Sequence, residues 1–148
     1  PVGTQEVELA VALGRRVEAH EEHEPIVGLG EGDVVDVVLV DAGTGVGDLS
    51  LSELTSIDHI FLTHSHLDHV ASIPFLVDTV GDLRAEPLTV WALPETIDAL
   101  RKHIFNWVIW PDFSEIPTPQ TPSLVFRPVA VGQVVQLGAR TVTALPAN

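Results

Sequence analysis

Short apolar runs along the chain predict strands. Residues 5–17 alternate glutamate with valine and leucine, which predicts a strand with one polar face. Continuous runs of β-branched, aliphatic and aromatic residues predict buried strands at 33–40, 57–63 and 87–93. Toward the end of the chain, similar runs predict strands at 124–131, 133–137 and 141–145.

Apolar residues at helical spacing predict helices between these strands. Residues 71–80 follow one buried strand, and Pro74 suits an early helical position. Residues 96–107 form a second candidate helix, and a short helical or turn segment is expected at 49–56. The Pro- and Thr-rich segment 116–122 predicts a loop. Strands that alternate with helices predict a layered α/β (α+β) fold.

Composition sets the size and class of the molecule. The chain has 148 residues, of which 45% are hydrophobic, enough for one domain spanning 1–148 with its own core. No apolar run is long enough to span a bilayer, and no signal peptide is visible, which predicts a cytoplasmic protein without a membrane partner. A periplasmic location stays open because the chain starts at Pro1 and contains no Met. The absence of Cys means that any metal must be held by His and carboxylate.

The charge balance bears on the partners. The formal net charge is −14, and the seven Lys and Arg residues do not form a dense cluster. Proteins that grip nucleic acid show a basic patch or stripe, so a nucleic-acid partner is not expected. A small anionic substrate remains compatible, because bound metals supply local positive charge.

The densest polar cluster of the chain is THSHLDH at 63–69, at the end of a predicted buried strand. His64 and His66 point the same way in extended backbone, so both can reach one ion at about 2.0–2.1 Å. Asp68 and His69 follow after the chain has turned and suit a second ion about 3.5–4 Å from the first. The spacing therefore predicts half the ligands of a site for two divalent ions, with Zn²⁺ favoured and Mn²⁺ as the alternative.

Other histidines and glycines are expected to have structural roles. His20 and His23 lie in the acidic segment 18–24, which predicts a solvated loop or strand edge. His103 is a lone helical histidine and is left out of the metal set. The segment 28–32 (GLGEG) lacks a following Lys-Ser/Thr and a helix, so it predicts a turn between strands instead of a phosphate loop.

The cluster also carries a family resemblance. The pattern His64-x-His66-x-Asp68-His69 resembles the HxHxDH signature of the metallo-β-lactamase fold superfamily. Within that superfamily, two segments are similar to the class II cyclic-nucleotide phosphodiesterases. They are the sequence around the motif at 61–74 (FLTHSHLDHVASIP) and the later segment 103–112 (HIFNWVIWPD). The resemblance implies an αββα four-layer sandwich, in which two sheets pack face to face with helices outside, incomplete in this chain.

The resemblance also implies an activity. It would be the metal-dependent hydrolysis of 3′,5′-cyclic nucleotides, cAMP or cGMP, to 5′-monophosphates by a hydroxide that bridges two metal ions. By the same resemblance, the ligands are His64, His66, Asp68 and His69, and Asp68 also helps to orient the hydroxide. Asp41 matches the Asp-rich strand end near the metal site, where it would orient a ligand. The alternative role for Asp41 is to cap its own turn.

The run 103–112 supplies candidate substrate contacts. Asn106, Trp107 and Trp110 are predicted to line a pocket that stacks a purine base, although aromatic residues at such spacing also serve as core.

The resemblance covers almost the whole chain but only about the first half of the superfamily's fold. Further ligands, a His, a bridging Asp and another His, are expected downstream of Asn148, which predicts a C-terminally truncated segment. Catalytic zinc sites normally use three protein ligands plus an open position, so weak metal binding and poor activity are expected from this chain alone. A homodimer or a complementing chain would have to supply the rest.

Three alternative functions stay open. One is another hydrolase on the same scaffold, such as a lactamase, thioesterase or lactonase, and the absent Cys disfavours the lactamases that use a Cys ligand. Another is an RNA-processing nuclease, which the acidity disfavours. A third is an inactive fragment that serves as a structural or interaction domain.

Overall fold

The computed structural model describes residues 7–13, 17–18 and 36–147. The strands are β1 (Val7–Leu13), β2 (Val17–Glu18), β3 (Val37–Val40), β4 (Ile57–Phe61), β5 (Leu88–Ala92), β6 (Pro117–Thr118), β7 (Thr121–Pro122), β8 (Leu124–Pro128), β9 (Val134–Leu137) and β10 (Arg140–Pro146). The α-helices are α1 (Leu51–Ser56), α2 (Leu67–Val70), α3 (Ile73–Val80) and α4 (Pro94–His103), with 3₁₀ turns η1 (Thr44–Asp48) and η2 (Gly81–Leu83).

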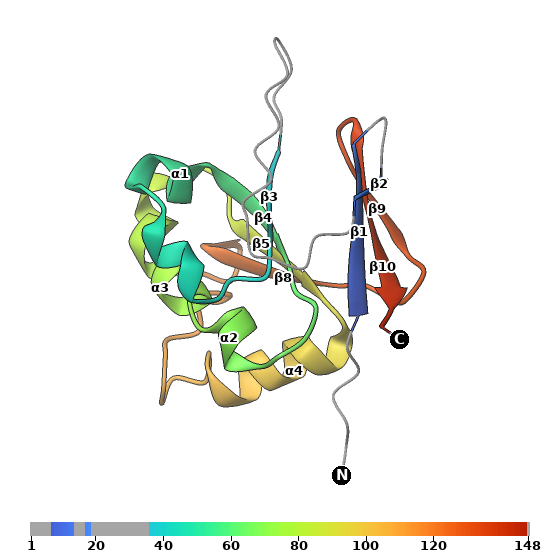
Figure 1. Cartoon of the computed structure of the whole chain (residues 1–148). Coiled ribbons are helices and arrows are strands. Elements are labelled where there is room, and N and C mark those ends of the chain that lie inside the picture. Colours follow the sequence, from blue (N-terminus) through green and yellow to red (C-terminus); the bar gives the residue numbers. More distant parts are fainter. Residues whose placement is uncertain (1–6, 14–16, 19–35, 148) are drawn as a thin grey trace.

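The strands form two main sheets that share a core between their facing sides. One is parallel with the order β3-β4-β5-β8, and the other is antiparallel with the order β2-β1-β10-β9. Figure 1 shows the helices on one side of the parallel sheet and the antiparallel sheet on the other. The α/β prediction is therefore confirmed, and the described residues build a helix layer and two sheet layers.

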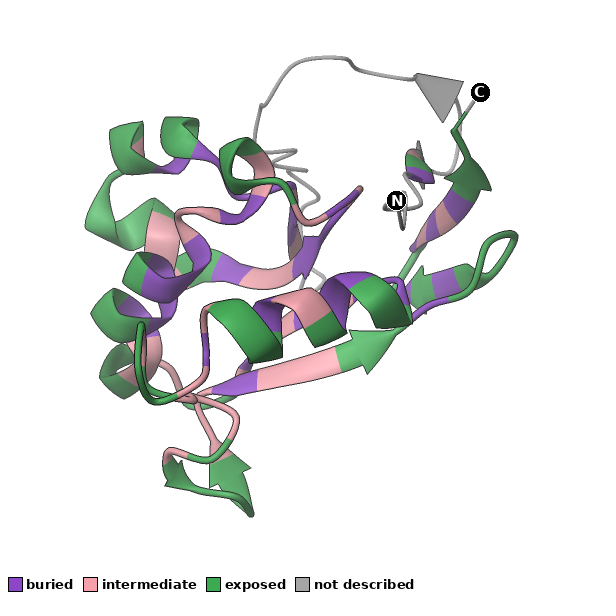
Figure 2. Ribbon diagram, turned by 90° about the horizontal axis from the view of Figure 1, so that it is seen from below, coloured by how far each residue is buried: buried purple, intermediate pink, exposed green. Residues whose placement is uncertain are grey.

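The face of the parallel sheet that the helices cover forms the larger core. Leu39, Ile60 and Val90 point from neighbouring strands into this core. The helices meet them with Val70 of α2, the apolar face of α3 and Leu100 of α4. Figure 2 shows buried residues alternating with exposed ones along the helices, most of them in α3 and α4. Helices that connect parallel strands must cover the sheet in this way to remove its apolar face from water.

The opposite face of the parallel sheet packs against the antiparallel sheet. Because side chains alternate along a strand, Val38 and Phe61 point to this side, next to residues that face the other core. Val135, Val142 and Ala144 meet them from β9 and β10. This second core packs β9 and β10, near the end of the chain, against β3 and β4.

Three predicted elements have different bounds in the structure. The helix predicted at 71–80 begins at Ile73, because the Ser72 amide donates to the Ala42 carbonyl (2.9 Å) and its hydroxyl to the Gly43 carbonyl (2.6 Å). The helix predicted at 96–107 ends at His103. There the side chain of Asn106 accepts from two later amides and Trp107 has φ +63°, which no α-helix allows. The loop predicted at 116–122 contains the two-residue pair β6-β7.

Several predictions lie outside the described residues. They concern the acidic segment with His20 and His23, the glycine turn at 28–32, and positions 33–35 of one predicted strand. Elsewhere, α1 confirms the short helix expected at 49–56, and Ser50 and Glu53 form a capping box at its start. None of the helices in the part of the chain that the structure describes combines the length and the apolar character needed to cross a bilayer.

His59 gives the fold a dependence on pH. Its side chain is partly buried, Trp91 Nε1 donates to its Nδ1 (3.2 Å), and Asp36 lies 3.9 Å from its Nε2. Burial lowers the pKa of His59 below its ordinary value of 6.5, more than Asp36 and Asp58 raise it. The unfolded chain therefore binds more protons than the folded chain as the pH falls below about 6.5, and the free energy of unfolding should fall with it.

Replacing His59 by glutamine should flatten this dependence. Denaturant titrations between pH 7.5 and 5 should show a smaller loss of stability per pH unit for His59→Gln than for the wild type. The difference between the two slopes cannot exceed about 1.4 kcal/mol per pH unit, which is one proton's worth. Equal slopes would show that His59 does not titrate differently in the two states.

Candidate metal centre

The candidate site lies at the carboxyl edge of the parallel sheet. β3 and β4 run in the same direction and end together, so the residues that follow them meet. The Asp41 amide donates to the Phe61 carbonyl (2.8 Å), which continues the ladder past the end of β3. This places Asp41, directly after β3, beside Thr63 and the histidine segment that follow β4.

Two histidines form the first pair of donor atoms. His64 Nε2 and His66 Nδ1 are 3.1 Å apart. Two nitrogens bound to one tetrahedral zinc ion at 2.0–2.1 Å would lie about 3.3 Å apart. The His64 residue is 8% exposed, so its ring is fixed by its surroundings. The pair fits two corners of a zinc tetrahedron.

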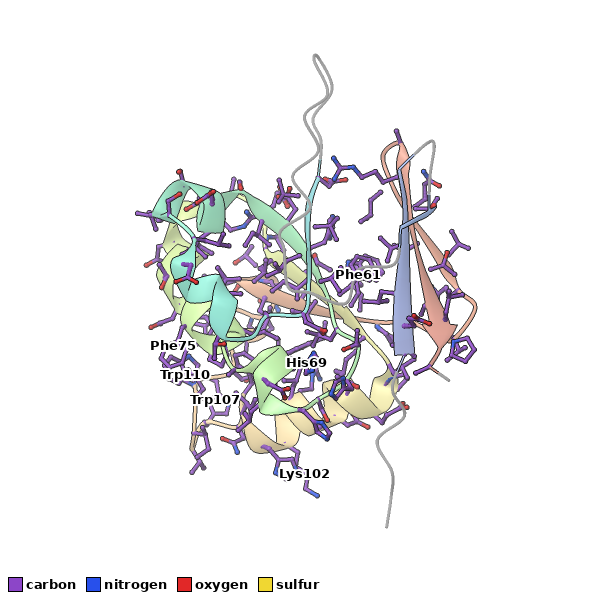
Figure 3. All side chains as sticks on the ribbon, viewed as in Figure 1. Phe61, His69, Phe75, Lys102, Trp107 and Trp110 are labelled. Carbon is purple, nitrogen blue, oxygen red and sulfur yellow. The ribbon has the colours of Figure 1, made fainter. Side chains whose placement is uncertain are left out.

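Asp68 and His69 form the second pair. His69 Nε2 and Asp68 Oδ2 are 3.4 Å apart, and the Asp68 side chain is 75% exposed. His69 lies in α2, for which His66 is the N-cap residue. The rings of His64 and His69 have centroids 4.0 Å apart, so the two pairs are neighbours. Figure 3 labels His69 at this helix.

Within the described ranges, no three His, Cys, Asp or Glu side chains converge on one metal position. The donors form pairs instead, each at a spacing compatible with two ligands of one ion. Imidazole and carboxylate are donors that zinc accepts. The residues therefore fit a divalent metal ion as partial ligand sets, two donors to a position.

Asp41 contacts the second pair at His69 Nδ1, the ring nitrogen that does not face Asp68. Its residue is 6% exposed and has φ +55°, a left-handed conformation that Asp tolerates better than most residues. Its carboxylate accepts from the Thr63 amide (Oδ1, 2.9 Å) and the Thr63 hydroxyl (Oδ2, 2.8 Å), and Oδ2 lies 2.7 Å from His69 Nδ1. A carboxylate can only accept, so His69 Nδ1 carries the proton of that bond. In neutral His69, the lone pair of Nε2 then faces the side of Asp68.

Sequence reasoning missed Thr63. Its hydroxyl contacts both the Asp41 carboxylate and His64 Nδ1 (3.0 Å). The signal was its position directly before His64 and just after a strand end, where side chains of neighbouring strands meet. The predicted orienting role of Asp41 stays a prediction, and these contacts support it.

The predicted pocket residues have structural contacts. The Asn106 side chain caps its own turn: Nδ2 donates to the Lys102 carbonyl, and Oδ1 accepts from Val108 and Ile109. Trp110 packs edge-on against Phe75, with ring centroids 5.0 Å apart. Figure 3 labels the two side chains next to each other. The Trp110 ring N–H is buried without a hydrogen-bond partner among the described residues. The role of Asn106 and Trp110 in holding a base stays a prediction.

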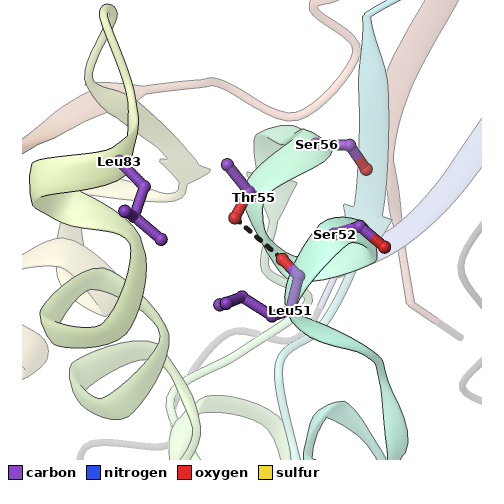
Figure 4. A pocket seen from close by; sticks show the side chains of 5 residues that line it. All are labelled: Leu51, Ser52, Thr55, Ser56 and Leu83. Atoms are coloured by element: carbon purple, nitrogen blue, oxygen red, sulfur yellow. Dashed lines mark hydrogen bonds between the residues drawn. The ribbon is translucent and has the colours of Figure 1, made fainter.

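A separate hollow lies at α1 and η2. Figure 4 shows its lining residues, Leu51, Ser52, Thr55, Ser56 and Leu83. The Thr55 hydroxyl donates to the Leu51 carbonyl (2.7 Å) and is thereby used within the helix. These side chains supply no titratable group and no metal donor of the His or carboxylate kind. The hollow therefore adds nothing to the candidate metal centre.

Comparison with known proteins gives the chain relatives of two kinds. Residues 51–148 match the family model of the class-II cAMP phosphodiesterases. The chain is 40% identical over 55 residues to 3′,5′-cyclic-nucleotide phosphodiesterase 1 of Saccharomyces cerevisiae, which is 36% of this chain and 15% of that protein. It is also 36% identical over 109 residues to ribonuclease Z of Bradyrhizobium sp. (strain ORS 278), 71% of this chain and 34% of that protein.

Solved structures show the fold. Unliganded yeast PDE1 matches with a TM-score of 0.57 and 18% identity, over 88% of this chain and 53% of that one. The metallo-β-lactamase fold protein YhfI of Bacillus subtilis matches with a TM-score of 0.51 and 16% identity, over 88% and 50%. The chain therefore has the metallo-β-lactamase fold, and it spans about half the length of these structures and less of the curated relatives.

Proposed function

We propose that this chain carries part of a metal-dependent active site for 3′,5′-cyclic nucleotides. The chain belongs to the family of class-II cAMP phosphodiesterases, whose model matches residues 51–148. The reaction would open cAMP or cGMP to the 5′-monophosphate. The family match supports the substrate class. The observation that carries the proposal is the His64 Nε2 to His66 Nδ1 distance of 3.1 Å, a ligand spacing beside a second His–Asp pair.

The residues of the chain have distinct roles in this proposal. His64 and His66 hold one divalent ion, and Asp68 and His69 hold the other, with zinc favoured over manganese. The bound ions would activate water and stabilise charge on the phosphate oxygens. Asp41 fixes the ring of His69 through Nδ1, so that Nε2 serves as the donor. The Asp68 side chain is 75% exposed, so water can reach it, and Asp68 would also orient the attacking water.

Each position still lacks ligands in this proposal. The described residues provide two donors to an ion, and catalytic zinc normally takes three from protein. The remaining ligands would come from outside the described residues, and a second copy or a complementing chain is one such source. A small anionic substrate, without a nucleic-acid or membrane partner, and a cytoplasmic location complete the proposal.

Product analysis tests the proposed activity. The purified chain with zinc or manganese should release 5′-AMP or 5′-GMP slowly from the cyclic nucleotides, and lactam, lactone and thioester substrates should stay intact. Asp68→Asn should abolish the release by removing a metal donor, and His103→Gln, in the exposed last turn of α4, should not change it. Metal-dependent cleavage of a lactone or thioester alone, or no release of nucleotide at all, would contradict the proposal.

Ribonuclease Z relatives favour a second candidate, RNA processing on the same fold. The net charge of −14 opposes it, because binding to a polyanion relies on Lys and Arg. Binding of a structured RNA at low salt separates the two functions. Tight binding that weakens steeply as salt rises would favour the nuclease, and none is expected here.

A further inference from the structure

The hydroxyl of Thr63 lies next to Asp41 and to the Nδ1 atoms of two histidines of the candidate metal centre. Its Oγ1 is 2.8 Å from Asp41 Oδ2 and 3.1 Å from Asp41 Oδ1. The same atom is 3.0 Å from His64 Nδ1 and 3.5 Å from His69 Nδ1. A single side-chain atom thus contacts one carboxylate and an imidazole of each donor pair.

The direction of these hydrogen bonds follows from the available protons. A hydroxyl has one proton, and an ionised carboxylate can only accept. The short contact with Asp41 therefore takes the Thr63 proton. Towards His64, Oγ1 can then only accept, so Nδ1 of His64 carries a proton and its Nε2 has the lone pair. That lone pair faces His66 Nδ1, the other donor of the first pair.

The Asp41 carboxylate determines directly which nitrogen of His69, in the second donor pair, carries the proton. His69 Nδ1 donates to Asp41 Oδ2 (2.7 Å), so the donor of His69 is also Nε2. The two histidines differ in how they reach Asp41. Among the contacts of the described residues, His69 touches Asp41 directly, whereas His64 is linked to it through the Thr63 hydroxyl.

We infer that Thr63 is a positioning residue, which relays the Asp41 carboxylate to His64 and so selects Nε2 of His64 as the metal donor. This inference rests on the proposed function only for the assumption that these nitrogens bind a metal ion. The tautomer of a histidine is fixed by the bond that its other nitrogen makes, and that bond also sets the ring's orientation. One buried carboxylate thereby prepares both metal positions, one directly and one through Thr63.

The backbone of Thr63 allows the hydroxyl to be tested alone. The Thr63 amide also donates to Asp41 Oδ1 (2.9 Å), and this bond does not need the side chain. Valine has nearly the shape of threonine without the hydroxyl, and serine keeps the hydroxyl without the methyl group. Thr63→Val therefore removes the relay, and Thr63→Ser is its matched control.

The experiment is nitrogen NMR of the histidine rings in the metal-free chain at one fixed pH, which shows which ring nitrogen carries the proton. The wild type and Thr63→Ser should show His64 and His69 protonated on Nδ1. Thr63→Val should show mixed tautomers for His64 and an unchanged His69. Asp41→Asn, in which an amide can donate to either ring, should disturb both.

Zinc affinity gives the second readout. Competition with a chromophoric chelator should show about 10- to 100-fold weaker binding at the His64 position in Thr63→Val, with rescue in Thr63→Ser. An unchanged His64 tautomer in Thr63→Val would overturn the inference. Equal losses of zinc affinity in Thr63→Val and Thr63→Ser would also overturn it. If Thr63→Val does not fold, an unchanged His64 tautomer in Asp41→Asn would overturn it instead. The tautomers are measured without substrate, so a failure of cyclic-nucleotide hydrolysis leaves this result readable.

Discussion

Replacing His64 and His66 together by alanine is expected to remove one of two bound metal ions and to abolish cyclic-nucleotide hydrolysis. Their nitrogens, 3.1 Å apart, are the two donors of one position, and nothing in an alanine side chain can replace them. The affinity of that position should fall by more than about 100-fold, beyond the 10- to 100-fold typical of residues that only orient a ligand. Asp68 and His69 should continue to hold the other ion.

Chelator competition in the double variant and in the wild type measures this loss. The reciprocal variant, Asp68→Ala/His69→Ala, should lose the other position and keep the first. His103→Ala is the control for the loss of a histidine, because His103 is exposed in the last turn of α4. Two sites of unchanged affinity in the His64/His66 variant would show that these donors are not a metal position.

Phe61→Ala should lower the free energy of unfolding by about 3–5 kcal/mol. The Phe61 side chain is 1% exposed and fills the core between the two sheets. Its ring stacks on Trp91, with centroids 5.5 Å apart and planes 5° from parallel. Truncation removes these contacts and leaves a cavity that neighbouring strands cannot fill without shifting.

Phe75→Ala is the matched control, since Phe75 is 61% exposed and lies on α3 beside Trp110 (Figure 3). Its loss should change stability by less than about 1 kcal/mol. Urea titrations of both variants and the wild type provide the comparison. A loss at Phe75 equal to that at Phe61 would mean that the core between the sheets does not contribute as the burial indicates.

The strands were the most predictable part of the fold. The runs around β4 and β5 combine β-branched and aromatic residues, and both sides of the parallel sheet are covered, so an apolar run gives the strand directly. Which sheet a strand joins could not be predicted. β8 and β9 are separated by a short turn, yet β8 pairs with β5 and β9 with β10. Pairing depends on partners far along the chain, which a local pattern does not contain.

Helix ends were less predictable for a similar reason. The apolar spacing that predicts a helix to residue 107 continues past His103, but the side chain of Asn106 and the left-handed Trp107 end the regular structure. The break between α2 and α3 depends on Ser72, whose bonds go to residues 42 and 43 after another strand. Such tertiary contacts decide boundaries without leaving a periodic signal.

In the candidate site, too, the residues defined by local spacing could be predicted, and those defined by tertiary contacts could not. His64, His66, Asp68 and His69 could be predicted together because their spacing within one segment carries the chemistry. The contact of Asp41 with His69 depends on two parallel strands ending at one edge. The resemblance, not the spacing, predicted that Asp41 orients a ligand, without indicating which one. The Thr63 hydroxyl gave no compositional signal, since its role comes from distances to three other side chains.

Equilibrium dialysis against a series of zinc concentrations up to the millimolar range, which fills weak two-donor positions, followed by elemental analysis, tests the central claim most directly. It asks whether this chain holds divalent metal at its histidine cluster. The wild-type chain should retain roughly two zinc ions, and the His64→Ala/His66→Ala variant roughly one. A folded wild-type chain that retains no more zinc than the buffer contains would contradict the assignment of a metal centre to these residues.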